Sequence, residues 1–311
     1  MKVLITGGTG FIGGHLRLAL AAGSHDLVML SRDPVRARER LPSGISVFKW
    51  NPVESPPPTE AFEGVEAVVN LVGESVVGIW TGSKRKRMYE SRVYATRNLV
   101  RGLEDSGARP RSFVSASAVG YYGDRGDEVL TEDVSPSSDF LSRLCVDWEN
   151  EALRAESLGI RAVCIRIGLV LGHDGGMIPA LLPAAKLGMF GRLGSGKQWW
   201  PWVHVDDVAG IARFSIENDI SGPVNATAPN PVRQGDFANT LGHVLGRRQF
   251  LNVPAALLRL GGDFSAEMLS SKKAVPRRAQ EAGYVFGHPD LEPALGDVLS
   301  NRLERGAPVG L

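Results

Sequence analysis

A glycine-rich turn between an apolar strand and a helix constrains the fold more than any other part of the sequence. It reads Thr-Gly-Gly-Thr-Gly-Phe-Ile-Gly over residues 6–13 and directly follows the apolar residues 3–5. It fits G-x-G-x-x-G from Gly8 to Gly13 and G-x-x-G-x-x-G from Gly7. Glycines allow a tight turn close to a pyrophosphate, and the following helix N-terminus offers free N–H groups. This context predicts dinucleotide binding, and the alternative is an ordinary glycine-rich turn.

Apolar strand-like runs alternate with helix-like stretches along the first part of the chain. Strands are expected at Lys2–Thr6, Asp26–Ser31, Ser46–Lys49, Ala67–Leu71, Ser112–Ser115 and Arg161–Ile167. Helices are expected between them, at His15–Ala22, Val35–Leu41, Ser83–Ser106 and Phe140–Leu158. The strands are almost continuously apolar, as in a parallel sheet covered on both faces. The pattern therefore predicts an α/β fold with a doubly wound parallel sheet of the Rossmann type.

The character of the sequence changes after residue 168, where glycine-rich and tryptophan-rich segments follow. One more helix is expected at Ile178–Lys186, and 223–227 is expected to return to the main sheet as a strand. We predict a Rossmann domain of residues 1–168 plus 203–228 and a small C-terminal substrate lobe of residues 169–202 plus 229–311. A dinucleotide would lie across the carboxyl ends of the strands, with substrate between the two parts.

The end of the second strand indicates which dinucleotide is bound. NAD sites usually place an acidic residue there, to bind the ribose 2′-hydroxyl. Here the strand ends in Ser31 and Arg32, which suit a 2′-phosphate, so NADP is favoured over NAD. The alternative is that Asp33 takes the acidic role in a shifted turn. The full predicted cofactor site is Gly7, Thr9, Gly10, Phe11, Ile12, Gly13, Ser31, Arg32, Trp50, Asn51, Leu71, Val72, Gly73, Glu74, Ser115, Ile167, Gly168 and Leu169.

Composition excludes several classes of function. The 311 residues are 43% apolar and 22% charged, with a net charge of +1, so a sizeable core is expected and binding to nucleic acid or to a membrane is not. No stretch of about 18 apolar residues predicts a transmembrane helix. We expect no targeting segment before the first strand, and a cytoplasmic setting. Cys145 and Cys164 are predicted core residues, and no metal site is expected.

Several segments together resemble the extended short-chain dehydrogenase/reductases, the NAD-dependent epimerase/dehydratase superfamily. They are Thr6–Gly13, Asn70–Gly73, Ser115–Ser117 followed by Tyr122–Asp124, and Val203–Ala209. Asn70–Ser75, the Tyr121-Tyr122 pair, Gly194–Gly196 and Pro201–His204 resemble a narrower, atypical subgroup called "epimerase family protein". That subgroup has a C-terminal extension of unknown role. The resemblance implies NADP binding and an undefined substrate.

The chain departs from the superfamily's catalytic pattern. That chemistry needs a tyrosine and a lysine four residues apart on one helix. The lysine lowers the pKa of the tyrosine from about 10, so that the tyrosine can move a proton near neutral pH. None of the tyrosines, at positions 89, 94, 121, 122 and 284, has a lysine four residues further on. Gln198–Trp202 also replaces the arginine that often precedes the Val-His-Val-Asp-Asp run in sugar-nucleotide epimerases. Such an indole-rich segment favours a flat or apolar substrate.

The remaining candidates for chemistry are Ser117, which matches the family's strand-end hydroxyl, and Tyr122, which matches a tyrosine lining the site. Their alternatives are a strand-end cap for Ser117 and a non-catalytic lining role for Tyr122. Glu74 is expected to bind ribose hydroxyls, or to act as an acid/base if its pKa were raised. His204 is expected to be a packed residue that braces Asp206, with Asp206 or Asp207 capping the following helix.

These residues predict an NADP-dependent oxidoreductase or epimerase-like enzyme that acts on a small-molecule substrate. The competing hypothesis is a non-catalytic NADP(H)-binding protein that reports redox state to a partner. Two long helices, Met88–Ser106 and Phe140–Leu158, carry apolar residues on more than one face. Members of the superfamily often dimerise through such helices, so a homodimer is expected, with a monomer as the alternative.

Overall fold

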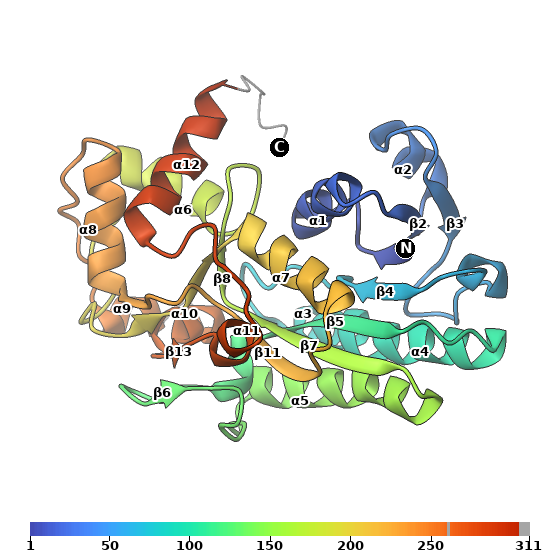
Figure 1. The fold of residues 1–311 in the computed structure, drawn as a ribbon. Coiled ribbons are helices and arrows are strands. Elements are labelled where there is room, and N and C mark those ends of the chain that lie inside the picture. Colours follow the sequence, from blue (N-terminus) through green and yellow to red (C-terminus); the bar gives the residue numbers. More distant parts are fainter. Residues whose placement is uncertain (260–261, 305–311) are drawn as a thin grey trace.

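A seven-stranded sheet forms the centre of the computed structural model, which describes residues 1–259 and 262–304 (Figure 1). The strand order is β11-β7-β5-β4-β1-β2-β3, and every pairing in it is parallel. The strands are β1 (Lys2–Thr6), β2 (Asp26–Ser31), β3 (Ser46–Lys49), β4 (Ala67–Asn70), β5 (Ser112–Ala118), β7 (Arg161–Ile167) and β11 (Gly222–Ala226). The predicted doubly wound sheet is confirmed, and its order reverses between β1 and β4, where such folds bind ligands.

Helices cover both faces of the sheet, as a buried parallel sheet requires. They are α1 (Phe11–Ala22), α2 (Pro34–Arg40), α3 (Gly82–Tyr89), α4 (Ala95–Ser106), α5 (Phe140–Leu153) and α7 (Val205–Glu217). Leu16 and Leu20 of α1 pack with Ile211 of α7 against one face. Leu99 of α4 and Ala152 of α5 pack against the other (Figure 1). Short 3₁₀ turns are η1 (Thr59–Phe62), η3 (Val119–Tyr122) and η4 (Arg154–Leu158).

The predicted helix over Ser83–Ser106 contains a π-helical turn, η2 (Glu90–Tyr94), between α3 and α4. Both Ser91 and Arg92, in this turn, bind the loop that follows β4. Ser91 Oγ accepts from the Glu74 N–H at 2.9 Å, and Arg92 Nη2 donates to the Glu74 carbonyl at 2.9 Å. Two successive residues of this turn therefore hold one loop, and π-helical turns of this kind are frequent at functional sites.

A second hydrophobic core lies past the carboxyl ends of β7 and β11 (Figure 1). It contains Leu171, Trp200, Trp202, Phe237 and Leu295, all of them buried. Its helices are α6 (Ile178–Lys186), α8 (Gln234–Val244), α9 (Ala255–Arg259), α10 (Gly262–Leu269), α11 (Arg277–Glu281) and α12 (Leu291–Glu304). Its short strands, and the strands that pair with them, are β6 (Val129–Leu130), β8 (Leu169–Leu171), β9 (Trp199–Trp200), β10 (Trp202–His204), β12 (Val232–Arg233) and β13 (Lys273–Ala274).

This second core draws on the segments predicted to form the small lobe. Residues 260–261 and 305–311 of that lobe lie outside the described residues. Cys145 and Cys164 are buried, as predicted for core residues. Within 1–259 and 262–304, no helix combines the length and the apolar character needed to cross a membrane.

Candidate cofactor-binding site

The glycine turn between β1 and α1 leaves no room for side chains at two of its positions. Gly7 has φ +69°, and a Cβ there would lie 2.8 Å from the Leu71 carbonyl oxygen. A Cβ on Gly13 would overlap the Gly7 carbonyl oxygen. The Gly10 N–H donates to that same oxygen at 2.9 Å and closes the turn. Both glycines are therefore required by the shape of the turn.

α1 begins directly after this turn, with Gly10 as its N-cap. No side chain caps the helix, and its first turn holds no acidic residue. The Gly14 N–H is bonded to the Gly10 carbonyl at 2.8 Å, so the backbone N–H groups of residues 11–13 precede the helical ladder. Thr9 and Gly10 are exposed beside them. An uncapped N-terminus with free N–H groups and a positive dipole end suits a phosphate.

Phe11 and Ile12, in the first turn of α1, are half-buried. The Phe11 ring packs directly against the backbone of Gly172 and Gly175, where a Cβ would overlap the ring. These glycines belong to the loop after β8, which thus lies over the start of α1. Phe11 supports the turn from this side, and the N–H groups of the helix remain its contribution to anion binding.

The end of β2 presents a guanidinium and no carboxylate. Ser31 Oγ donates to the Asp33 carbonyl at 3.0 Å, and Arg32 is exposed. Among the described residues, no hydrogen bond or ion pair engages the Arg32 side chain. Asp33 is the N-cap of α2, and its Oδ1 accepts from the Arg36 N–H at 3.0 Å. Because the Asp33 carboxylate caps α2, the alternative that it binds a ribose 2′-hydroxyl loses support.

Two predicted cofactor residues follow β3. Trp50 is 3% exposed and belongs to the core, and its indole N–H donates to the Ser55 carbonyl at 2.8 Å. Its backbone N–H donates to the Ser31 carbonyl at 2.9 Å. Asn51 is half-buried at the same edge. The structure thus places the Trp50 side chain inside the protein, where it orders the chain next to Ser31.

The predicted segment Leu71–Glu74 leaves β4 beside the glycine turn. The Leu71 N–H donates to the Thr6 carbonyl at 3.2 Å, and Val72 is half-buried while Gly73 is exposed. The Glu74 carboxylate lies 3.2 Å from Lys84 Nζ and 3.6 Å from Arg87 Nε. The hydrogen bond from Lys84 lowers the pKa of Glu74 below its ordinary value. This is opposite to the raised pKa that an acid/base role requires.

Ser115, in the middle of β5, is fully buried. Its hydroxyl accepts from Asn70 Nδ2 at 3.3 Å and donates to the Ala116 carbonyl at 3.2 Å. Its side chain therefore joins neighbouring strands inside the sheet. Ile167, Gly168 and Leu169, at the carboxyl end of β7 and just beyond it, are half-buried.

Ser117 and Tyr122, the predicted catalytic residues, are both buried, at 3% and 0% exposure. Ser117 Oγ donates to Glu149 Oε1 at 2.6 Å, and Arg166 binds both oxygens of Glu149 at 2.8 Å. The Tyr122 hydroxyl donates to Asn225 Oδ1 at 2.7 Å and accepts from Arg166 Nη1 at 3.0 Å. The two hydroxyls thus complete one buried network around the Arg166–Glu149 ion pair.

Burial sets the protonation of two groups in and beside this network. Burial raises the pKa of Tyr122 to about 12, although Arg166 acts in the opposite direction. Burial also raises the pKa of Cys145, on α5, to about 12. Both therefore keep their protons near neutral pH. The Arg166 guanidinium lies 3.4 Å from the centroid of the Tyr121 ring, which covers the ion pair as a cation–π partner.

Sequence reasoning missed Glu149, Arg166 and Asn225. A signal was present: Arg166 lies inside an otherwise apolar strand, and a buried charge needs a partner of opposite sign. The partner's identity was not readable, because Glu149 reaches Arg166 only through the packing of α5 on the sheet.

The expectation that the indole-rich segment would meet a flat or apolar substrate is wrong for Trp200 and Trp202. Trp200 and Trp202 are 1% and 0% exposed and fill the second core. Trp199 is half-buried, with its indole N–H donating to Asp127 at 2.7 Å and Arg233 stacked over its ring. Half-buried apolar side chains instead gather at the carboxyl edge of the sheet, from Leu71, Trp80, Phe140, Leu141 and Ile167.

His204 caps α7, which corrects the expectation that Asp206 or Asp207 does so. Its Nδ1 accepts from the Asp206 N–H at 3.2 Å. Asp207 is 2% exposed and binds the segment before α12. It accepts from the Tyr284 hydroxyl at 3.0 Å, the Gly287 N–H at 2.8 Å and the His288 N–H at 2.9 Å. Asp207 therefore joins the sheet domain to the C-terminal segment.

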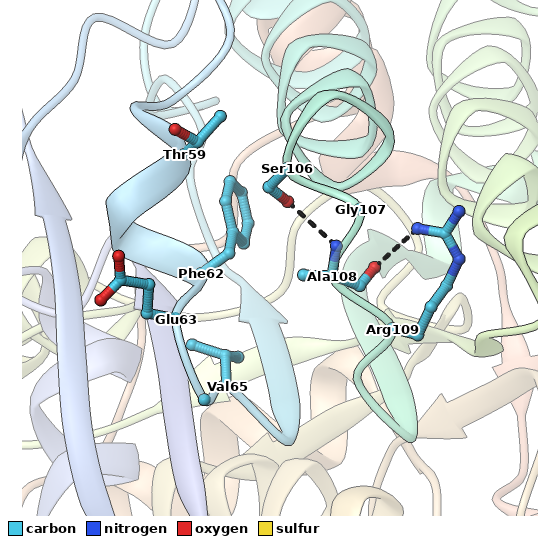
Figure 2. A pocket seen from close by; sticks show the side chains of 9 residues that line it. Thr59, Phe62, Glu63, Val65, Ser106, Gly107, Ala108 and Arg109 are labelled. Atoms are coloured by element: carbon cyan, nitrogen blue, oxygen red, sulfur yellow. Dashed lines mark hydrogen bonds between the residues drawn. The ribbon is translucent and has the colours of Figure 1, made fainter.

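A pocket of about 360 Å³ lies far from the carboxyl edge of the sheet (Figure 2). It is formed by η1, the residues just before β4 and the end of α4, with Phe62 and Ser106 among its lining residues (Figure 2). Those residues precede β4 and β5, so the pocket opens at the amino end of the strands. The glycine turn follows a strand, so it lies at the opposite end of the sheet.

A parallel sheet with an uncapped helix N-terminus at its switch point defines a dinucleotide-binding Rossmann protein. The chain belongs to the NAD dependent epimerase/dehydratase family, whose model matches residues 3–227. Residues 253–298 match a domain of unknown function, DUF1731. The predicted family and its C-terminal extension are both confirmed.

Relatives match over nearly the whole chain. Epimerase family protein YfhF of Bacillus subtilis is 36% identical, over 97% of this chain and 99% of its own. A chloroplastic SDR39U1 homolog of Arabidopsis thaliana is 37% identical, over 96% of this chain and 87% of its own. The crystal structure of human epimerase family protein SDR39U1 with NADPH has a TM-score of 0.85 at 32% identity and covers 97% of this chain and 100% of its own.

Proposed function

We propose that the protein binds NADP(H) in preference to NAD(H). The observation that carries this proposal is the end of β2, where Arg32 is exposed without a partner among the described residues and Asp33 is committed as a helix cap. A guanidinium binds a phosphate with charge-assisted hydrogen bonds. The human relative, whose structure contains NADPH, supports the same choice.

The residues of the site fit the parts of such a cofactor. The N–H groups at residues 11–13 suit the pyrophosphate, and the Gly7 and Gly13 positions leave the backbone accessible where a Cβ would fill the turn. Ser31 and Arg32 suit the 2′-phosphate. Leu71 and Ile167 offer an apolar surface at the strand ends for the nicotinamide half. When bound, the cofactor supplies hydride transfer.

We propose further that the protein is an oxidoreductase acting on a small, partly apolar substrate. Trp80, Phe140 and Leu141 extend the apolar surface beside the predicted nicotinamide position. Ser117 and Tyr122 would act by positioning, because their hydroxyls are buried and bonded to Glu149, Asn225 and Arg166. The reaction would therefore take its proton from another group or from water.

The second candidate function is that of an NADP(H)-binding protein that reports redox state without catalysis. The specific observation in its favour is that both predicted catalytic hydroxyls are held in a structural network. A pure sensor needs the cofactor site and a responsive surface, and it needs no proton donor.

Two measurements test these proposals in sequence. Calorimetric titration with NADPH and NADH should give the tighter dissociation constant for NADPH, and equal constants would contradict the cofactor proposal. The NADPH-bound protein is then presented with aldehydes, ketones and quinones that carry apolar or aromatic groups, while nicotinamide absorbance is followed. Oxidation that depends on both protein and acceptor supports the enzyme, and tight NADPH binding without any oxidation supports the sensor.

A further inference from the structure

Two histidines and an aspartate converge where the loop after β8 meets α1. His15 lies on α1, and His173 and Asp174 lie in the loop. One ligand atom from each lies within 4.8 Å of the other two. His15 Nε2 is 3.3 Å from Asp174 Oδ1, and His173 Nδ1 is 3.8 Å from the same oxygen. The side chains of His15 and His173 are 14% and 19% exposed, and that of Asp174 is 51% exposed.

The separations of the two histidine nitrogens from Asp174 Oδ1 are close to those between the ligands of a small tetrahedral cation. Zn²⁺ binds histidine nitrogen and carboxylate oxygen at about 2.0–2.2 Å, which places tetrahedral ligand atoms roughly 3.3–3.5 Å apart. The His15–Asp174 distance falls in this range, and the His173–Asp174 distance exceeds it by a few tenths of an ångström. Three protein ligands leave a fourth position, on the exposed side of Asp174, for water.

A neighbouring carboxylate fixes which nitrogen of a neutral His15 ring carries the proton. His15 Nδ1 donates to Asp206 Oδ1 at 2.6 Å. A neutral ring that donates from Nδ1 carries its lone pair on Nε2, which is the atom that faces Asp174. Carboxylate–histidine–metal arrangements of this kind orient the ligand and raise its basicity. Asp206 therefore gives the cluster an orienting partner.

The loop that carries two of the three groups is held in place by its own contacts. Gly172 and Gly175 pack on the Phe11 ring, one turn before His15 on α1. Gly176 forms an isolated bridge with Leu171, at the end of β8. The position of the loop on α1 is thus set by packing, independently of the His15–Asp174 contact.

A second cluster, His204, His288 and Asp297, has the same ligand types but a different hydrogen-bond pattern. His204 Nδ1 accepts from the Asp206 N–H, so a neutral His204 ring carries its proton on Nε2. That Nε2 faces Asp297 at 3.3 Å. His204 therefore has no lone pair to offer on the side where the other two groups lie.

We propose that His15, His173 and Asp174 bind one Zn²⁺ ion, with Asp206 orienting His15. The ion would replace the proton between His15 Nε2 and Asp174 and fasten the loop after β8 to α1. Because α1 begins at the glycine turn, the ion would stiffen the segment next to the anion-binding N–H groups. The expectation of no metal site rested on the cysteines, and these histidines lie far apart in the sequence.

Zinc titration of the chelator-treated full chain tests this proposal. ZnCl₂ should bind with a stoichiometry of one ion per chain, raise the thermal midpoint and release protons, because the ligands must be deprotonated. Asp206→Asn removes the orienting partner and should weaken Zn²⁺ binding by roughly 10- to 100-fold. His15→Asn and His173→Ala each remove a ligand and should weaken it by more than that. Co²⁺ added in place of Zn²⁺ should give the visible absorption of a tetrahedral site.

Two variants serve as matched controls. His243→Asn removes an exposed histidine that lies 3.5 Å from Glu292, and His288→Asn removes a ligand of the second cluster. Both should keep the Zn²⁺ affinity of the parent, and circular dichroism should show that every variant is folded. The proposal is overturned if Zn²⁺ does not bind, if His15→Asn and His173→Ala bind it as tightly as the parent, or if His288→Asn removes the binding. None of these readouts depends on NADPH or on activity.

Discussion

Ser117 Oγ donates a hydrogen bond to Glu149 Oε1 over 2.6 Å, with both side chains buried between β5 and α5. The same Glu149 oxygen accepts from Arg166 Nε at 2.8 Å. A hydroxyl that donates its proton to a buried carboxylate in this way cannot also donate it to a substrate. This relationship turns a predicted catalytic serine into a testable structural one.

Ser117→Ala should lower the free energy of unfolding and leave NADPH affinity unchanged. The substitution removes a hydrogen bond to a charged acceptor, which contributes about 1.5–3 kcal/mol. Urea denaturation measures the stability, and calorimetry measures the binding. A variant with the stability of the parent but with abolished turnover on an identified substrate would instead assign Ser117 to catalysis.

Arg32→Ala should weaken NADPH binding by about 10- to 100-fold and leave NADH binding nearly unchanged. The lost interaction is a charge-assisted hydrogen bond of about 1.5–3 kcal/mol, made only to the 2′-phosphate. Arg40→Ala, at the far end of α2, is the matched control for charge and should preserve both affinities. Equal weakening of NADPH and NADH by Arg32→Ala would show that this residue does not read the phosphate.

Asp33→Ala and Asp33→Asn separate a helix cap from a ribose ligand. As an N-cap, Asp33 stabilises α2 by about 1 kcal/mol, and asparagine caps nearly as well. Asp33→Ala should therefore lower the stability while Asp33→Asn preserves it, in thermal or urea unfolding. Neither should weaken NADH binding. A large loss of NADH affinity in both variants would return Asp33 to the acidic role.

Asp207→Ala should loosen the segment of residues 284–288. The substitution removes the charged acceptor of the Gly287 and His288 N–H groups, and each such hydrogen bond contributes about 1.5–3 kcal/mol. Hydrogen exchange should rise in this segment and in α12, ahead of the sheet. Asp219→Ala, whose side chain is 99% exposed, should leave the exchange pattern as it is. An increase in exchange spread evenly over the chain, or no increase at all, would contradict the anchoring role of Asp207.

Tyr122 should make the stability depend on pH only at alkaline values. Burial raises its pKa to about 12 in the folded protein, against about 10 in an unfolded chain. The unfolded state therefore loses this proton first, and the contribution is fully present below pH 10 and lost as the pH rises toward 12. Urea denaturation across this range should show a shallower loss for Tyr122→Phe. Parallel curves for the two proteins would place the Tyr122 pKa at its ordinary value.

The sequence predicts the sheet well because the strands are local features. β1, β2, β3 and β7 have the predicted bounds, since each is an apolar run ended by polar or turn residues. The start of α1 was missed by four residues, because glycines at 10, 13 and 14 disfavour a helix in isolation. Packing of Phe11 on the loop after β8 supports those residues in helical form.

The candidate site divides in the same way. The glycine turn and the Ser31-Arg32 pair are readable because neighbouring residues form them. The roles of Ser117, Tyr122 and Trp200 were not readable, because their partners lie on distant elements. Arg166 contacts Glu149 only because β7 and α5 pack together, so the spacing of residues in the sequence does not predict this contact.

The π-helical turn at Glu90–Tyr94 sets the direction in which the side chains of the following helix α4 point. Within it, Arg92 donates to the Glu74 carbonyl in the loop after β4, and beyond it Arg97 donates to Glu151 on α5. Each residue of a helix advances the direction of its side chains by about 100°. Removing one residue from the turn would swing Leu99 and Leu103 off the sheet, so this segment tolerates changes of residue far better than changes of length.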